Sequence, residues 1–278
     1  MPSTTDPVSA VTSHECRLPD GRRLAYASAG DPDGTPVVVH HGTPGSRLFA
    51  ALLADDARDV GVRVLIPDRP GYGRSTPPPD GWTWTEWSDD FAALLTAESI
   101  GNTGVVGFSG GGPYALAAAS TGRVNRVGLL SASVPGSDTV FGQVVRVPFA
   151  LRALFRISGL LARVVGPSVV VDQYTERSVS DAVTAAIGAE FGEALRQDAR
   201  APVRELRGLA AATGSAETVS AARSVPIRAW HGTADTNAPL PPLRRTVREL
   251  GGTVETVDAD HLGTVLDCRR EALAWAAA

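Results

Sequence analysis

Along the chain, short continuous runs of hydrophobic residues alternate with segments in which hydrophobic residues recur at helical spacing. Four runs of mainly aliphatic residues predict buried strands, because a strand covered on both faces has no polar residue at every second position. These runs are PVVVHHG (36–42), VRVLIP (62–67), TGVVGF (103–108) and VNRVGLLSAS (124–133). The segments between them have helical spacing and cover 46–61, 83–100 and 113–120. This order predicts an α/β protein with a doubly wound, mostly parallel sheet.

Four further strands extend this sheet near the two ends of the chain. They are HECRL (14–18) and RRLAYAS (22–28), then PIRAWHG (226–232) and GTVETVDA (252–259). The first two flank the turn Asp20-Gly21 and predict an antiparallel hairpin. A helix near 239–250 separates the other two, and a last helix is expected from about residue 263. The predicted sheet therefore has eight strands.

The alternation stops in the middle of the chain. Between residues 134 and 224 the pattern predicts several helices in succession, including 148–166 and 180–212. We therefore expect an α/β core formed by residues 1–133 and 225–278, with an inserted helical block over 134–224.

Composition and charge restrict the partners. The 278 residues are 43% hydrophobic, which is enough for a substantial core. The net charge of −4 comes from 26 basic and 30 acidic residues without a long run of either sign. We therefore expect a small-molecule substrate, and neither nucleic acid nor a membrane as partner.

The cysteines and the amino-terminal sequence indicate a compartment. Cys16 and Cys268 match no metal or redox spacing and are interpreted as free thiols in a reducing compartment, with a disulfide between them as the open alternative. The first residues lack the basic start and apolar core of a signal peptide, and no run approaches 18 apolar residues. We expect a soluble, cytoplasmic protein.

The sequence Gly107-Phe108-Ser109-Gly110-Gly111 has the form G-x-S-x-G between a predicted strand and a predicted helix. This is the context of a nucleophile elbow, in which a sharp turn exposes a serine hydroxyl above the sheet. Gly107 and Gly111 are expected to be glycines because a side chain at either position would collide with the neighbouring strand or helix. Ser109 is the predicted nucleophile.

A serine hydroxyl needs a base to take its proton, and the chain has five histidines. His261 lies after the last predicted strand, in the place that the order serine, acid, histidine gives to the base. Asp235 follows the strand PIRAW directly and is the favoured acid. Asp258 and Asp260 are closer to the histidine in sequence, and Asp138 is a further candidate.

Stabilising the oxyanion requires backbone N–H groups that already point at the developing charge. One is expected from Gly110, the residue after the nucleophile. The other is expected from the loop HHGTPGS (40–46), where the N–H of Thr43 is the candidate donor.

Five segments in this order resemble the α/β-hydrolase superfamily, in its lid-bearing group of esterases and proline iminopeptidase-like enzymes. They are HHGTPGS, PDRPGYGRS, GFSGGG, HGTAD and DHLG. The resemblance implies that Ser109, Asp235 and His261 form a catalytic triad, and that Thr43 and Gly110 form the oxyanion hole. It implies that His41 and Gly42 organise the oxyanion loop.

The resemblance has further implications for the rest of the chain. Asp68, Arg69 and Ser75 would support the site, and residues 134–224 would form the cap that sets substrate choice. A monomer or homodimer is usual in this family. The cap aromatics indicate a largely apolar pocket; they are Phe141, Phe149, Phe155, Tyr174 and Phe191.

The function expected from these residues is hydrolysis of a small-molecule ester, thioester or lactone through an acyl-enzyme, with no metal and no organic cofactor. One alternative is a non-hydrolytic enzyme of the same fold, such as a cyclase, lyase or acyltransferase. A second is a non-catalytic ligand-binding protein on the same scaffold.

Overall fold

All eight predicted strands form one sheet in the computed structural model, which describes residues 7–136, 145–211 and 215–278. The strand order is β1-β2-β4-β3-β5-β6-β7-β8. β2 is antiparallel to both of its neighbours, and the other pairs are parallel. The strands are β1 (Thr12–Arg17), β2 (Arg23–Gly30), β3 (Thr35–His40), β4 (Val62–Pro67), β5 (Thr103–Phe108), β6 (Val124–Leu130), β7 (Ile227–Gly232) and β8 (Thr253–Val257). The predicted fold class and the amino-terminal hairpin are confirmed.

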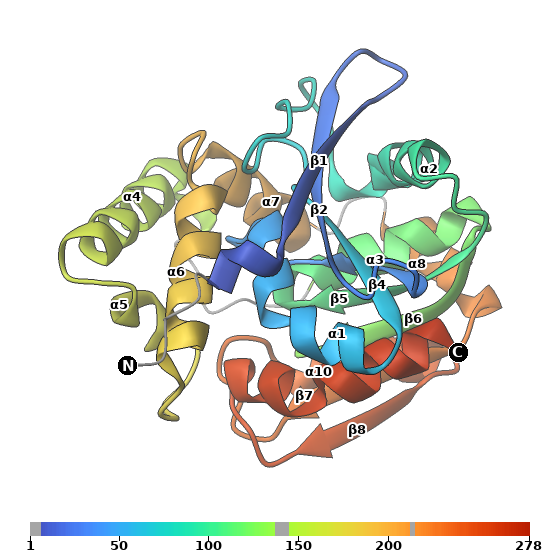
Figure 1. Cartoon of the computed structure of the whole chain (residues 1–278). Coiled ribbons are helices and arrows are strands. Elements are labelled where there is room, and N and C mark those ends of the chain that lie inside the picture. The colour runs from blue at the N-terminus through green and yellow to red at the C-terminus, as the bar shows by residue number, and fades with distance from the viewer. Residues whose placement is uncertain (1–6, 137–144, 212–214) are drawn as a thin grey trace.

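Helices cover both faces of the sheet (Figure 1). The α-helices are α1 (Ala54–Asp59), α2 (Trp87–Ala97), α3 (Gly112–Ala118), α4 (Pro148–Val164), α5 (Ser168–Val171), α6 (Asp181–Ala194), α7 (Arg200–Ala211), α8 (Ser215–Ala221), α9 (Leu240–Glu249) and α10 (His261–Ala277). Short 3₁₀ segments are η1 (Pro7–Ala10), η2 (Arg47–Leu52), η3 (Trp84–Glu86), η4 (Ser109–Gly111), η5 (Ala119–Thr121) and η7 (Ala222–Ser224).

The core is divided by the central strands into two layers. Side chains on successive strand residues point to opposite faces, so Val105 belongs to the core cluster that includes residues of α2, α3 and α9, while Val106 belongs to the cluster that includes residues of α1 and α10. β5 lies between β3 and β6 and all six of its residues are buried. Its carboxyl end is therefore held rigidly in the middle of the sheet, and this end carries Ser109.

Three predicted helices differ from the structure. The segment 180–212 forms two helices, α6 and α7, because the chain leaves the helical conformation between them and Asp198 has a left-handed φ of 74°. The segment 46–61 is not one helix, because Leu53 N–H bonds the Ala50 carbonyl in the tighter 3₁₀ pattern, and α1 starts afresh at Ala54. The last helix begins at His261 rather than at residue 263, because the Asp260 carboxylate accepts from the Gly263 N–H and caps it.

Helices α4 to α8 lie between β6 and β7 in sequence, as the predicted insertion requires. Figure 1 shows α4, α5, α6 and α7 gathered on one side of the molecule. The domain limits 134–224 stay a prediction. Among the described residues, no helix combines the length and apolar character that a membrane span needs.

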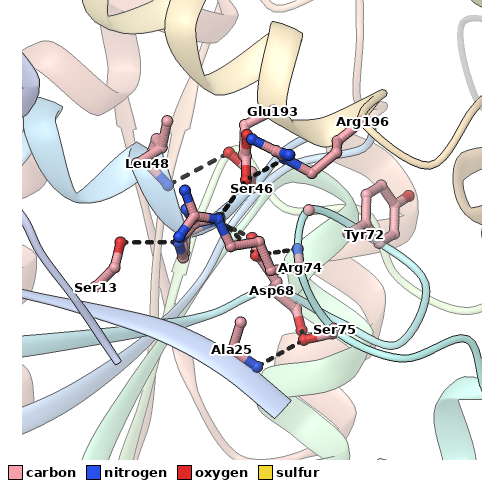
Figure 2. Close-up of polar contacts among 12 residues, drawn as sticks. Ser13, Ala25, Ser46, Leu48, Asp68, Tyr72, Arg74, Ser75, Glu193 and Arg196 are labelled. Carbon is pink, nitrogen blue, oxygen red and sulfur yellow. Dashed lines mark hydrogen bonds and ion pairs between the residues drawn. The ribbon is translucent and has the colours of Figure 1, made fainter. Parts of the chain in front are cut away.

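A buried ion-pair network fixes α6 to the core (Figure 2). The Arg47 guanidinium lies 2.8 Å from Asp68 and 2.6 Å from Glu193 of α6, and its Nε donates to Ser13 of β1 at 3.1 Å. Asp68 also accepts from the Arg74 N–H at 2.9 Å. Because Arg47 and Asp68 are buried, this network holds α6 in a defined place above the sheet.

Candidate active site

Ser109 lies on a strained turn directly after β5. Its φ is 51°, a left-handed conformation that non-glycine residues rarely adopt. A Cβ on Gly107 would lie 2.7 Å from the Gly111 carbonyl oxygen, and a Cβ on Gly111 would lie 2.2 Å from the His40 carbonyl oxygen. Both positions therefore require glycine if the turn is to keep its shape.

The structure brings Ser109, His261 and Asp235 into one chain of hydrogen bonds. His261 Nε2 lies 3.0 Å from Ser109 Oγ, and His261 Nδ1 lies 2.8 Å from Asp235 Oδ2. The second Asp235 oxygen accepts from the N–H groups of Asn237 (2.8 Å) and Ala238 (3.0 Å). These contacts fix the carboxylate and the ring in a single orientation.

The protonation of this chain follows from its electrostatics. Burial alone would raise the pKa of Asp235, but its hydrogen bond to His261 and the backbone donor at Ala238 outweigh burial and lower the pKa. An ionised Asp235 only accepts hydrogen bonds, so the proton of a neutral His261 lies on Nδ1. Nε2 is then free to accept the Ser109 hydroxyl proton.

Among the described hydrogen bonds, neither Asp258 nor Asp260 bonds the His261 ring. Asp260 accepts from Gly263 N–H, from Thr175 Oγ1 at 2.7 Å and from Glu176 N–H at 2.9 Å, so it caps α10 and holds the segment after α5. Asp258 contributes its backbone carbonyl to Arg177. Asp138 lies outside the described residues.

The remaining histidines occupy other positions. His14 bonds Ser28 at 2.8 Å on the hairpin, and His40 accepts from the indole N–H of Trp87 at 3.3 Å. His231 is buried beside Asp235, at 3.6 Å, and burial lowers its pKa. Among the described contacts, His261 alone of the five histidines bonds Ser109.

The loop after β3 packs against the residue that follows Ser109. A Cβ on Gly110 would lie 3.3 Å from the Thr43 backbone nitrogen. The Gly42 carbonyl accepts from Arg69 Nη2 at 2.8 Å and lies 2.8 Å from His41 Nδ1. Because the Gly42 carbonyl and the Thr43 N–H belong to one peptide unit and point in opposite directions, holding the carbonyl aims the Thr43 N–H away from Arg69.

Arg69 is held by a glutamate that the sequence analysis missed. Its guanidinium is fully buried and contacts both carboxylate oxygens of Glu205 in α7, at 2.7 and 2.9 Å. Glu205 also accepts from Tyr114 at 3.0 Å and from the Thr43 hydroxyl. Burial alone would lower the pKa of Arg69, and Glu205 reverses this and raises it. The inserted helix α7 thus reaches the loop beside Ser109.

Two cavities meet at Ser109, and Thr43, Tyr174 and His261 border both. The smaller has a volume of about 30 Å³, with Glu190 of α6 as its acidic residue. The larger has a volume of about 310 Å³. Its apolar lining residues are Leu154, Phe155, Phe191, Leu206 and Leu209.

The predicted cap aromatics divide between the cavities and the surface. Phe155, Tyr174 and Phe191 line the larger cavity. Phe149 does not, because it lies on the outer face of α4 with 78% of its surface exposed. Phe141 lies outside the described residues. Over residues 7–136, 145–211 and 215–278, no three or more His, Cys, Asp or Glu side chains are grouped to hold a metal ion.

Comparison with known proteins identifies relatives and structural neighbours. A non-heme chloroperoxidase of Streptomyces lividans is 38% identical over 126 residues, which is 42% of this chain and 43% of that protein. A proline iminopeptidase of Xylella fastidiosa is 38% identical over 104 residues, 37% of this chain and 33% of that protein. The chain therefore spans less than half the length of these curated relatives.

Solved structures match over nearly the whole chain. An esterase from Exiguobacterium antarcticum superimposes with a TM-score of 0.71 at 19% identity, covering 94% of this chain and 97% of that one. An enol-lactonase from Burkholderia xenovorans LB400 superimposes with a TM-score of 0.65 at 19% identity, again covering 94% of this chain and 97% of that one. At this identity the likeness shows the fold. The model of the Alpha/beta hydrolase family matches residues 37–276, so the chain belongs to the α/β-hydrolase family.

Proposed function

We propose that this α/β-hydrolase-family enzyme is a serine hydrolase that cleaves a small-molecule carboxylic ester, thioester or lactone. The observation that carries the proposal is the chain of hydrogen bonds from Ser109 through His261 to Asp235, located where two cavities meet. The names of an esterase and an enol-lactonase among the structural neighbours agree with this class of substrate.

The mechanism follows from the protonation of the site. His261 Nε2 takes the Ser109 proton while Oγ attacks the substrate carbonyl, and ionised Asp235 stabilises the imidazolium that forms. The imidazolium then protonates the leaving alcohol, which departs and leaves the acyl group on Ser109. Water repeats the attack with His261 as base and releases the acid.

The tetrahedral intermediate carries an oxyanion, and the N–H groups of Thr43 and Gly110 are the proposed donors. The support for this pair is the close packing of Gly110 against Thr43 and the anchoring of the Gly42 carbonyl on Arg69. Removing one such donor typically costs about 3 kcal/mol of transition-state stabilisation.

Labelling with a fluorophosphonate tests the proposed function. We expect a mass increase on the peptide that contains Ser109, because an activated serine attacks phosphorus as it attacks a carbonyl. Ser109→Ala should abolish the label, and His261→Ala should slow labelling strongly because the base is lost. A folded wild-type protein that takes up no label would overturn the proposal.

Gly110→Ala is expected to lower kcat for ester hydrolysis by at least about 100-fold, the size of effect that follows loss of an oxyanion donor. The added Cβ would meet Thr43 Oγ1 at 2.0 Å and Thr43 Cβ at 2.7 Å, so the loop must move. The measurement is steady-state kinetics on a p-nitrophenyl ester. Gly101→Ala is the matched control, because its Cβ meets no atom within 4 Å and it should keep wild-type kinetics. Equal rates for both variants would remove Thr43 from the oxyanion role.

A further inference from the structure

Glu190 brings a carboxyl group into an otherwise apolar part of the site. It lies on the core-facing side of α6, one helical turn from Ile187 and Ala186, and its residue is 8% exposed. Glu190 borders the smaller cavity together with Ser109. Most of the other residues around this cavity are apolar; they are Pro44, Phe49, Leu52, Phe108, Ile187 and Leu262.

The carboxyl of Glu190 receives little hydrogen bonding from the protein. Among the described residues its one hydrogen bond comes from the Ser46 N–H at 3.4 Å, which is long for such a bond, and no cation pairs with it. Two other glutamates of the inserted helices are paired: Glu193 contacts Arg47 and Glu205 contacts Arg69. An unpaired carboxylate at this depth would be costly, so the carboxyl favours its uncharged form.

The titratable groups around Glu190 do not reverse this preference. They come from four segments of the chain and are His41, Arg69, Tyr174 and His261. Burial raises the pKa of Glu190 to about 8, with the Ser46 N–H and Arg69 acting against it. Arg69 is committed to Glu205, and burial holds the pKa of His41 well below its usual range, so His41 is uncharged at neutral pH. An uncharged carboxyl has an O–H to donate.

The two cavities differ in what they can hold and release. Most of the residues that wall the smaller are buried, and its volume of about 30 Å³ has room for about two water-sized groups, so only a short chain fits there. The larger extends to the surface at Leu154, which is 43% exposed, and offers a way out for a leaving group. The part of the substrate that stays on Ser109 therefore belongs in the smaller cavity beside Glu190.

We propose that Glu190 is a specificity-determining residue that donates a hydrogen bond to an oxygen atom in the acyl chain, so that the preferred substrates are esters of short oxygen-bearing acids. The oxygen is an ether, hydroxyl or keto oxygen a few atoms from the scissile carbonyl. This inference rests on the proposed function, because it assigns the acyl group to the smaller cavity on the assumption that Ser109 is acylated.

Three isosteric phenyl esters test the proposal: butanoate, methoxyacetate and 3-aminopropanoate. Methoxyacetate places an ether oxygen where butanoate has a methylene group, and 3-aminopropanoate places an ammonium group at the chain end. Each is measured with the wild type, with Glu190→Gln, which keeps an N–H donor, and with Glu190→Leu, which has none. Fluorophosphonate titration of active sites corrects each rate for folded enzyme.

The expected readout is the methoxyacetate-to-butanoate ratio of kcat/KM, because the intrinsic reactivity of each ester cancels between variants. We expect this ratio to fall about tenfold in Glu190→Leu, the worth of one good hydrogen bond, and to stay within about threefold in Glu190→Gln. In the wild type the ratio should also fall as pH rises through about 8, while in Glu190→Gln it should not change.

The outcomes separate the two proposals. An equal ratio in all three proteins, with butanoate hydrolysed, would overturn the role of Glu190 and leave the serine hydrolase standing. A preference for 3-aminopropanoate that disappears in Glu190→Gln would overturn it in favour of an ionised carboxylate that binds a cation. Hydrolysis of none of the esters, together with no fluorophosphonate label, would overturn both.

Discussion

Ser109→Ala is expected to lower kcat for ester hydrolysis about 10⁶-fold, the loss seen when a triad nucleophile is removed. Alanine lacks the oxygen that would bond to the substrate, so the two-step route through an acyl-enzyme is closed. The remaining rate would come from substrate binding and from the oxyanion donors, which act on direct attack by water. Steady-state kinetics with phenyl butanoate measures the effect, after removal of any wild-type contamination.

The matched control is Ser120→Ala. Ser120 follows α3 on the surface, and its hydroxyl donates to the Ala117 carbonyl at 2.7 Å. This variant should keep the wild-type rate, while both variants keep the wild-type circular dichroism. A Ser109→Ala protein with more than about 1% of the wild-type kcat would show that hydrolysis does not use this serine.

Glu205→Ala is expected to destabilise the fold by about 3–5 kcal/mol, because it leaves the Arg69 guanidinium charged, buried and without its carboxylate. The change also removes the acceptor of the Tyr114 hydroxyl and of the Thr43 hydroxyl. Chemical denaturation followed by tryptophan fluorescence measures the free energy of unfolding. The protein that does fold should have a reduced kcat, because the loop around Thr43 loses a support.

A double variant separates the lost pairing from the lost volume. Arg69→Met with Glu205→Leu removes both charges and keeps apolar bulk, so it should recover a large part of the stability that Glu205→Ala loses. A surface pair serves as the reference: Asp55→Ala breaks the exposed contact with Arg58 at 3.0 Å and should cost less than about 1 kcal/mol. Equal losses for Glu205→Ala and Asp55→Ala would contradict the importance assigned to the buried pair.

The sheet and the elbow could be predicted because their signals are local. Apolar runs such as TGVVGF indicate buried strands within a few residues. The glycines beside Ser109 are required because a side chain would clash within the same turn. The position of His261 after the last strand also followed from chain order. Its place as the first residue of α10 did not, because that depends on the cap which Asp260 forms.

The roles of Glu190 and Glu205 could not be predicted in this way because the residues that surround them are distant in the sequence. The Arg69–Glu205 contact joins residues 136 positions apart, and only the docking of α7 brings them together. A signal was nevertheless present. Each glutamate falls among the apolar positions of its helix, Glu190 with Ile187 and Glu205 with Leu209, where a charged residue needs an explanation.

Asp260 joins the segment after α5 to the start of α10, the helix that begins at His261. One carboxylate oxygen holds the first turn of α10, and the other holds Thr175 and Glu176 in the segment after α5. Displacing that segment breaks the hydrogen bonds from Thr175 and Glu176 to Asp260. The Asp260 side chain, which caps α10, is then held less firmly. Displacing the segment and fraying the first turn of α10 are therefore coupled, so each lowers the free energy needed for the other. A ligand that holds the segment in place should slow deuterium uptake at the Gly263 amide.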